Sequence, residues 1–407
     1  MKYIKYGFSA FTKYLSTNII IILQLIFLFT ALNVIIGNYN SRDILYSPYK
    51  SILKNKGYAF YTDYESEMYD PQTGEYLRSF DDCFKETESK LIGEYNSYVI
   101  YSAEIADDVQ SQKRLKLIFI DDRIYDNLEL PLVSGKWENK ENEIYGIISN
   151  NTHNLGTGSS VYIGDSKITI SGELTDPTYI PSFTLWIYNL CVTDFYSAEY
   201  SKTSQYDYLL LKLSSLESIK NTNALVGNGY DGMVLIEFSD DISNEDMELN
   251  KEILNSSGEN VTLTSFDDIK NRSDVYENEE YNKTKPIILL VWIITLSGVI
   301  CSSAIITVKS LRDYTIFYIC GSKWSQCLLI SFINSAISVF ISMGIAMGLI
   351  QIGLLNGFSE DIGFVIKENN ILITLIVAVI TLSLSIIMPL IIFKTKQPKD
   401  IINSYNI

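Results

Sequence analysis

The sequence predicts an α-helical membrane protein with four transmembrane helices and a large extracytoplasmic α+β domain. Three observations support this fold class. Apolar residues gather in four uncharged blocks, one near the N-terminus and three in the last third of the chain. Most of the charge lies between the first block and the second. The three flanks that are rich in basic residues all fall on one predicted side of the membrane.

The segment between the first two blocks, residues 38–285, is strongly acidic. The whole chain has 32 Lys and Arg against 48 Asp and Glu, and 10 of the basic and 5 of the acidic residues lie outside this segment. The segment therefore holds 22 basic and 43 acidic residues, a net charge of −21. Such a surface repels nucleic acid and anionic headgroups and attracts cationic ligands by long-range fields. We expect no nucleic-acid partner. A basic peptide is a candidate ligand, although the charge can also serve solubility alone.

The first block predicts a transmembrane helix over residues 18–37, after a cytoplasmic N-terminus of residues 1–17. It carries no charge and has about the 20 residues that a bilayer core requires. A cleaved signal peptide would have a shorter apolar region and a small-residue cleavage site. Asn33, Val34 and Ile35 do not form such a site, so we expect a retained helix.

The other three uncharged blocks predict transmembrane helices over residues 286–308, 326–355 and 371–393. Pro286 suits the first turn of a helix, where the N–H of any residue would have no partner within the helix. The blocks leave a loop at 309–325, a second loop at 356–370 and a tail at 394–407.

The flanking charges predict the orientation in a cell membrane. The loop 356–370 has one lysine against three acidic residues, whereas the other flanks are basic. We therefore expect both termini in the cytoplasm and residues 38–285 outside. The nine basic residues behind this prediction are Lys2, Lys5, Lys13, Lys309, Arg312, Lys323, Lys394, Lys396 and Lys399.

The segment 38–285 has a mixed α and β pattern. Runs rich in Tyr, Ile, Leu and Val predict strands, and two stretches between them have helical spacing. A strand-rich insertion of about 127–206 interrupts this α/β subdomain, and 265–285 predicts a stalk helix continuous with the second membrane helix. The predicted strands are 57–63, 98–104, 115–121, 207–213 and 233–238, and the predicted helices, each in a strand–helix–strand unit, are 81–96 and 214–226.

Signals for catalysis, cofactors and metals are absent from the sequence. His153 is the single histidine, and no HExxH, GxSxG or GxxxxGK[ST] motif occurs. The acidic run from Asp241 to Glu252 is similar to a calcium loop, but Asp246 stands where that loop needs glycine. We expect Ser243 to cap a helix there instead. The two cysteines of the segment, Cys83 and Cys191, could form a disulfide or stay unpaired.

The loop 309–325 is the most informative cytoplasmic segment. Tyr314, Phe317 and Tyr318 recur at helical spacing, and Gly321 is a stop signal. The pattern predicts a short amphipathic helix between two membrane helices. Such a helix can rest in the lipid interface or dock a cytoplasmic protein.

The loop has an order of arginine, acid, two hydrophobic residues, glycine and serine, at Arg312, Asp313, Ile316, Phe317, Gly321 and Ser322. In this order the loop resembles that of the MacB/FtsX-like permeases of ABC systems. The layout of one helix, an outer domain and three helices is similar to that family over nearly the whole chain. In the domain, Leu130–Trp137, Gly164-Asp165 and Ile168–Gly172 are similar to the family pattern, and in the tail so are Pro389 and Lys396–Ile402. Three positions depart from it: Asp313 and Asn334 replace usual glutamates, and Tyr318 replaces a usual basic residue. The loop residues that the resemblance assigns to ATPase coupling are Arg312, Asp313, Ile316, Phe317, Tyr318, Gly321 and Ser322.

The resemblance implies a non-catalytic permease subunit, a homodimer or paired with a second permease. A separate cytoplasmic ABC ATPase would bind ATP and Mg²⁺ and move the membrane helices as levers, for export or handling of a peptide or another envelope substrate. The uncharged blocks favour transmission of force over a hydrophilic pore. Two other classes stay open: a sensor of antimicrobial peptides and an FtsX-like regulator of an external cell-wall hydrolase. Binding of a basic peptide by the isolated domain would favour sensing or export. Recovery of a hydrolase in pull-downs with the chain would favour the regulator.

Overall fold

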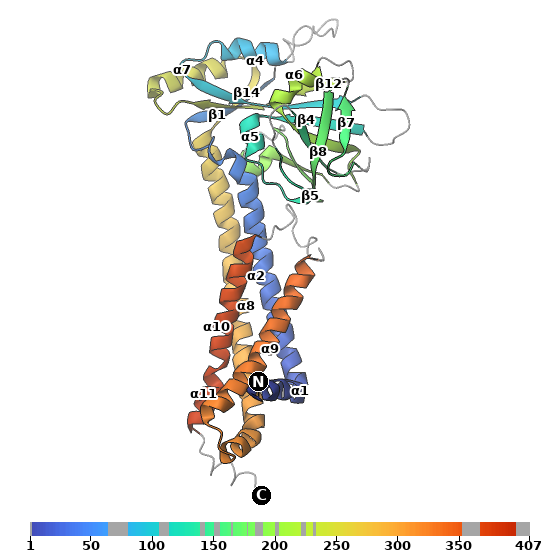
Figure 1. Cartoon of the computed structure of the whole chain (residues 1–407). Coiled ribbons are helices and arrows are strands. Elements are labelled where there is room, and N and C mark those ends of the chain that lie inside the picture. Colours follow the sequence, from blue (N-terminus) through green and yellow to red (C-terminus); the bar gives the residue numbers. More distant parts are fainter. Residues whose placement is uncertain are drawn as a thin grey trace. The chain divides into compact units, whose positions relative to one another are not determined.

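The computed structural model in Figure 1 has two compact units. The described residues up to Asn40 and from Glu279 onward form the membrane unit, and those from Ser41 to Asn278 form the α+β domain. Two helices, α2 and α8, are continuous from one unit into the other. The structure describes residues 2–63, 80–105, 114–138, 143–149, 155–163, 166–176, 178–183, 190–199, 203–220, 225–230, 233–351 and 367–395.

Four helical spans in the described residues are long and apolar enough to cross a membrane, which confirms the predicted number. They are α2 (Leu15–Lys50), α8 (Phe266–Ile319), α9 (Trp324–Gln351) and the consecutive pair α10 (Glu368–Ser385) and α11 (Ile387–Thr395). Within the membrane unit they run side by side, as Figure 1 shows. A further helix, α1 (Lys2–Lys13), precedes α2 and was not expected.

Two helices are longer than their predicted spans. The prediction ended the first at residue 37, but α2 continues to Lys50. The predicted stalk of 265–285 lies in α8, so Pro286 stands inside a helix and not in a first turn. Bilayer thickness sets the length of the apolar stretch alone. The helix itself can continue for as long as one of its faces packs against the rest of the protein. In α2, Leu45 and Tyr49 do so after the apolar stretch has ended.

The last span is interrupted, although one helix over 371–393 was predicted. Ile386 separates α10 from α11. Proline has no N–H, so Pro389 leaves the carbonyl of Ser385, four residues earlier, without its helical donor. The hydroxyl of Ser303 on α8 donates to that carbonyl at 2.8 Å. A side chain of a neighbouring helix thus replaces the missing backbone bond.

Between the spans, buried polar side chains accompany an apolar core, and many other apolar side chains point outward. Asn18 of α2 bonds to Asn334 of α9 at 3.1 Å, and Asn33 of α2 donates to the Thr374 hydroxyl of α10 at 2.9 Å. All four side chains are buried. Lipid tails are as apolar as leucine, so spans associate through close packing and such hydrogen bonds. These bonds fix the register of α2 against α9 and α10.

One sheet of the domain has four strands in the order β14-β1-β13-β2, all antiparallel. Helices α4 (Phe80–Glu88) and α7 (Asn244–Asn255) contribute Phe84 and Leu254 to its core. The expected cap of α7 is confirmed, because the Ser243 hydroxyl accepts from the N–H of Asp246 at 3.0 Å. The strands are β1 (Gly57–Asp63), β2 (Tyr95–Tyr98), β13 (Met233–Phe238) and β14 (Glu259–Ser265).

The second sheet has eight strands in the order β12-β3-β4-β11-β6-β8-β5, with β7 also paired to β8. It is mixed, since β4 runs parallel to β11 and β6 parallel to β8. Helices α5 (Asp122–Asp126) and α6 (Leu216–Lys220) accompany it. The strands are β3 (Ile100–Ile105), β4 (Arg114–Ile120), β5 (Leu132–Gly135), β6 (Ile144–Ile148), β7 (Ser160–Ile163), β8 (Ser166–Leu174), β11 (Tyr206–Lys212) and β12 (Leu225–Tyr230).

The strand grouping within the domain differs from the prediction. The predicted insertion of 127–206 does not form a body of its own, because β6 pairs with β11 and so joins the sheet of β3 and β4. The two strands of the predicted unit around 214–226 belong to different sheets, β11 to one and β13 to the other. Local periodicity identifies a strand but does not specify its partner. The α+β class itself is confirmed.

A small two-stranded sheet, β9 (Thr178–Pro181) with β10 (Tyr196–Glu199), stands between β8 and β11 in the chain. The short helix η1 (Val192–Phe195) precedes β10. The Tyr196 hydroxyl donates to the carbonyl of Leu45 on α2 at 3.0 Å, and the N–H of Val192 donates to the hydroxyl of Ser273 on α8 at 3.0 Å. This segment, residues 178–199, therefore joins the domain ends of both helices.

Several predictions fall on residues outside those described. They concern His153, the loop 356–366, Gly164-Asp165 and the tail from Lys396 to Ile402. Cys83 and Cys191 are described, and each is a free thiol, so the disulfide between them is not formed.

Candidate functional site

The predicted coupling segment forms the end of α8. No glycine or proline stands between Val299 and Cys320, so nothing interrupts the helix before Ile319. The prediction of a separate short helix in the loop 309–325 is therefore wrong. The segment is instead a direct extension of the second membrane span.

Gly321 ends α8, as predicted. Its φ is +95°, a conformation that favours glycine. The N–H of Ser322 donates to the Phe317 carbonyl at 2.9 Å, and the N–H of Gly321 to the Tyr318 carbonyl at 3.0 Å. This pair of bonds is the Schellman arrangement of a helix C-terminus. Helix α9 begins three residues later at Trp324, so α8 and α9 form a helical hairpin.

The aromatic side chains of the segment are largely used inside this hairpin. Phe317 is half-buried, with its ring centroid 5.1 Å from that of Tyr6 on α1. Tyr318 stacks on Trp324 at 4.9 Å, and Trp324 stacks on Phe393 of α11 at 5.0 Å. The family resemblance assigns Phe317 and Tyr318 to ATPase coupling. In the structure Phe317 packs against Tyr6, while Tyr318 stacks on Trp324 and stays 40% exposed.

Asp313 is also engaged within the chain. Its carboxylate forms an ion pair with Lys13 at the end of α1, and this hydrogen bond raises the pKa of the Lys13 ammonium. Nearby, the Tyr14 hydroxyl donates to the carbonyl of Lys309 at 3.1 Å. These contacts attach α1 and its junction with α2 to the end of α8.

Three other residues of the segment remain exposed and lie on one side of α8. Arg312, Ile316 and Ile319 follow one another at intervals of four and three residues, which places them on one helix face. Ile316 is 50% and Ile319 63% exposed. We call these three residues the outer face of α8. They combine a cation with apolar area, as interface hot spots do.

The hairpin extends beyond the junction of α1 and α2. Lys309 and Asp313 bond to Tyr14 and Lys13, so these residues stand at the same level along the bundle. Six further residues of α8, at 1.5 Å each, reach about 9 Å past that level. The outer face is thus carried on a projecting, packed element.

The α+β domain has an open acidic groove of about 590 Å³. Glu237 lines it but is buried and neutralised, because Arg123 donates to its carboxylate at 2.7 Å and Tyr98 and Asn55 bond to it as well. The other groove residues are Gly93, Glu94, Tyr95, Asn96, Phe238, Ser239 and Asp240.

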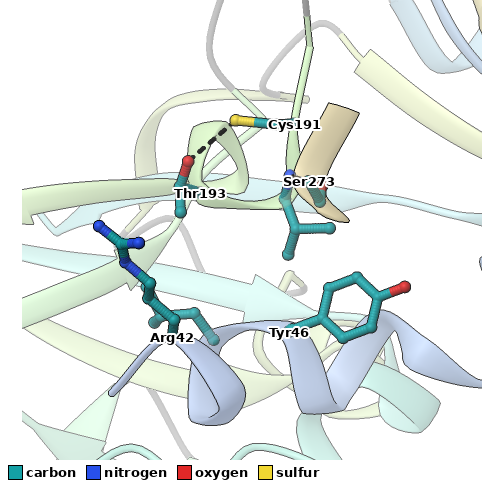
Figure 2. A pocket seen from close by; sticks show the side chains of 7 residues that line it. Arg42, Tyr46, Cys191, Thr193 and Ser273 are labelled. Carbon is teal, nitrogen blue, oxygen red and sulfur yellow. Dashed lines mark hydrogen bonds between the residues drawn. The ribbon is translucent and has the colours of Figure 1, made fainter. Parts of the chain in front are cut away.

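Figure 2 shows a much smaller cavity, of about 20 Å³, beside α2 and α8 in the domain. Arg42, Cys191 and Ser273 are among its lining residues. The Cys191 thiol donates to Asp194 at 3.1 Å, and burial raises its pKa, which keeps it protonated and unreactive. A space of this size holds about one water molecule. Across the described parts of the chain, no group of three or more His, Cys, Asp or Glu could hold a metal ion.

Sequence reasoning missed α1 and its contacts with α8. The signal was present, since Ile4, Phe8 and Phe11 recur at intervals of four and three residues with Lys5 and Lys13 between and after them. The stacking of Trp324 on Phe393 joins residues 69 positions apart by number. No local pattern could indicate that pair.

Fold and site together define a membrane protein with four helical spans, an α+β domain with two main sheets, and a projecting hairpin at the end that carries α1. No protein-family model and no curated protein matches the chain. Three solved domains are similar to it in part. The periplasmic region of MacB from Actinobacillus actinomycetemcomitans is 12% identical with a TM-score of 0.27, over 55% of this chain and 94% of that domain.

The extracellular domain of the noncanonic ABC-type transporter YknZ from Gram-positive bacteria is 12% identical with a TM-score of 0.27, over 51% of this chain and 99% of that domain. A domain of a putative permease protein from Porphyromonas gingivalis is 14% identical with a TM-score of 0.23, over 53% of this chain and 89% of that domain. With TM-scores below 0.5, these likenesses do not define a family for the chain.

Proposed function

We propose that this chain is the non-catalytic permease subunit of an ABC-type system. In this proposal a separate ATPase docks on the projecting hairpin, and its ATP-driven motion passes through the membrane helices to the α+β domain. The substrate would be a peptide or another molecule of the cell envelope. Two copies of the chain, or one copy with a second permease, would complete the membrane part.

The continuity of α8 is the observation that carries this proposal. It is one helix of 54 residues whose first turns belong to the domain and whose last turns form the projecting hairpin. Backbone bonds between residues one turn apart make a helix stiff, and in α8 Pro286 removes one of these bonds without ending the helix. Force applied to the outer face of α8 would therefore be felt along the whole helix.

The contacts around the hairpin suit transmission of force. Asp313 and Lys13 join α8 to α1, while Trp324 and Phe393 join α9 to α11. A push on the hairpin would thus reach all the spans at once. In addition, the spans carry no charged side chain in their central parts and pair their buried amides with one another. A polar substrate path normally needs ionisable groups facing a cavity.

An ATP-driven role requires a partner, because the sequence has no phosphate-binding loop. The partner would bind ATP and Mg²⁺. The outer face of α8 offers it two exposed isoleucines beside the Arg312 cation. Truncating such a hot spot costs about 2 kcal/mol or more, which is about a 30-fold loss of affinity.

The test is to purify the tagged full chain from its native membranes and to measure vanadate-sensitive ATP hydrolysis in the preparation. The double variant Ile316→Ala with Ile319→Ala should lose most of that activity while it inserts and purifies normally. The matched control is Ile287→Ala with Leu290→Ala, on the same helix and 63% and 57% exposed. The control should keep the activity.

Two results would count against the proposal in different ways. If the unaltered chain carried no ATPase activity, the ABC-type role would fail. If both double variants kept the activity, the role would stand but the outer face of α8 would not be the docking site.

A further inference from the structure

Helix α1 exposes two large apolar side chains next to its charged face. Ile4 is 58% and Phe8 56% exposed, and they stand one turn apart. Lys5, Ser9 and Thr12 are exposed on the adjoining face. A helix with one apolar and one basic face is typical of elements that lie in a membrane surface.

The face of α1 that adjoins Ile4 and Phe8 on the side away from Lys5 is fixed to the bundle. Gly7 lies so close to α9 that a β-carbon there would stand 2.4 Å from the side chain of Ile333. Phe11 is buried, and its carbonyl accepts from the Asn18 side chain at 2.9 Å. With Tyr6 packed on Phe317 in its first half and Lys13 paired to Asp313 at its end, α1 is held along its length. The side that bears Ile4 and Phe8 is therefore presented in a set direction.

The surroundings of α1 favour lipid as the occupant of this side. The same apolar exposure continues along the chain into α2, at Leu15, Ile19 and Ile20. These residues belong to a span that needs lipid around it. In Figure 1, α1 lies across the direction of the spans and not along them, as an element in the membrane surface would.

The charge at this level indicates the kind of lipid. Lys5, Lys309 and Arg312 are exposed cations at the end of the bundle that carries α1. Each basic residue near an anionic membrane surface adds attraction that falls off within a Debye length. A surface of anionic phospholipid complements this group better than a zwitterionic one.

We propose that α1 is a membrane-surface anchor that recognises anionic phospholipid, with Ile4 and Phe8 at the acyl-chain boundary and Lys5 among the phosphate headgroups. Its contacts with Asp313 and Lys309 attach this lipid contact directly to the end of α8. The inference concerns lipid alone and stands whether or not an ATPase binds the hairpin.

The test uses the full chain in vesicles, with a nitroxide label on Phe8→Cys or, as matched control, on the neighbouring Ser9→Cys. The exposed cysteines Cys301 and Cys320 and the half-buried Cys191 are first replaced by alanine, while Cys83 and Cys327 are buried and stay. Collision rates with oxygen and with a water-soluble nickel chelate then report lipid and water exposure. We expect the label at position 8 to favour oxygen and the label at position 9 to favour nickel.

The headgroup is tested by exchanging phosphatidylcholine vesicles for vesicles that also contain phosphatidylglycerol. The label at position 8 should move deeper in the second kind, and Lys5→Gln should reduce that shift. Equal nickel access at positions 8 and 9 would overturn the proposal, as would shielding of position 8 from both reagents, which indicates a protein contact. A depth that does not respond to phosphatidylglycerol would overturn the anionic recognition.

Discussion

Replacing Ser303 by alanine should destabilise the bundle because of a proline on another helix. The Ser303 hydroxyl is the donor to the Ser385 carbonyl, which Pro389 leaves without a backbone donor. Ser303, Ser385 and Pro389 are all buried, so water cannot replace the lost bond. In the variant Pro389→Ala, residue 389 regains an N–H that can bond to Ser385 along the helix.

The expected magnitude follows from these contacts. A hydrogen bond between spans contributes about 0.6 kcal/mol on average and about 1.7 at most, and a buried carbonyl left unpaired costs about 1 to 3 kcal/mol. We therefore expect Ser303→Ala to cost about 1.5 kcal/mol when proline is at 389. The same change should cost well under 1 kcal/mol when alanine is at 389, because the carbonyl then keeps a donor.

The assay is equilibrium unfolding of the full chain in mixed micelles with increasing sodium dodecyl sulfate, followed by circular dichroism. The four proteins of the double-mutant cycle are compared, and the coupling free energy is the quantity of interest. A coupling of about 1 kcal/mol is expected. If Ser303→Ala cost the same with proline and with alanine at 389, the bond would not compensate for the missing N–H.

Other outcomes follow from single features of the molecule. Gly321→Ala should cost about 1 kcal/mol in the same assay, because φ is +95° there, while Gly344→Ala, a glycine with open space around it, serves as the control. Asn33→Leu should cost about 1 kcal/mol because it removes the bond to Thr374, and no loss would contradict a role for that bond in bundle register. Burial raises the pKa of Tyr208 to about 12. The phenol ionises near pH 10 in the unfolded chain, so the stability that Tyr208 contributes should be fully present below pH 10 and lost between pH 10 and 12. In Tyr208→Phe, the fall of the unfolding free energy with pH over this range should be shallower by one proton. Finally, a membrane-impermeant thiol reagent added to intact cells should label Thr157→Cys, at an exposed position, but not Lys2→Cys, and labelling of Lys2→Cys would reverse the predicted orientation.

The parts of the fold that depend on local pattern could be predicted from the sequence. Strands β1 and β13 have the bounds that were predicted from their composition, since each is a short run rich in aromatic and aliphatic residues. The four spans were predictable because uncharged blocks of bilayer length have few other uses. Gly321 was recognisable as a helix end because only a few residue types tolerate its φ.

The parts that depend on tertiary partners could not be predicted. β6 and β11 are distant in sequence, and their pairing, which merges the predicted insertion with the rest of the sheet, leaves no local trace. In the candidate site, helical spacing identified Phe317 and Ile316 equally well. Only the position of Tyr6 on α1 shows that Phe317 faces inward and Ile316 outward. Side-chain role at this site is therefore set by a helix that the sequence pattern did not reveal.

The segment 178–199 also has a consequence for how the chain is made. Its two bonds reach back 151 residues to Leu45 and forward 81 residues to Ser273. Doubling a loop adds only about 0.6 kcal/mol of closure entropy, so the two closures are almost equally favourable. They differ in time, because Leu45 leaves the ribosome before the segment and Ser273 after it. The nascent domain can thus form the bond between Tyr196 and Leu45 of α2 early. It can form the bond between Val192 and Ser273 only when the start of α8 has emerged. In a chain that stalls before Ser273, the N–H of Val192 therefore lacks the hydroxyl that accepts its bond in the complete domain.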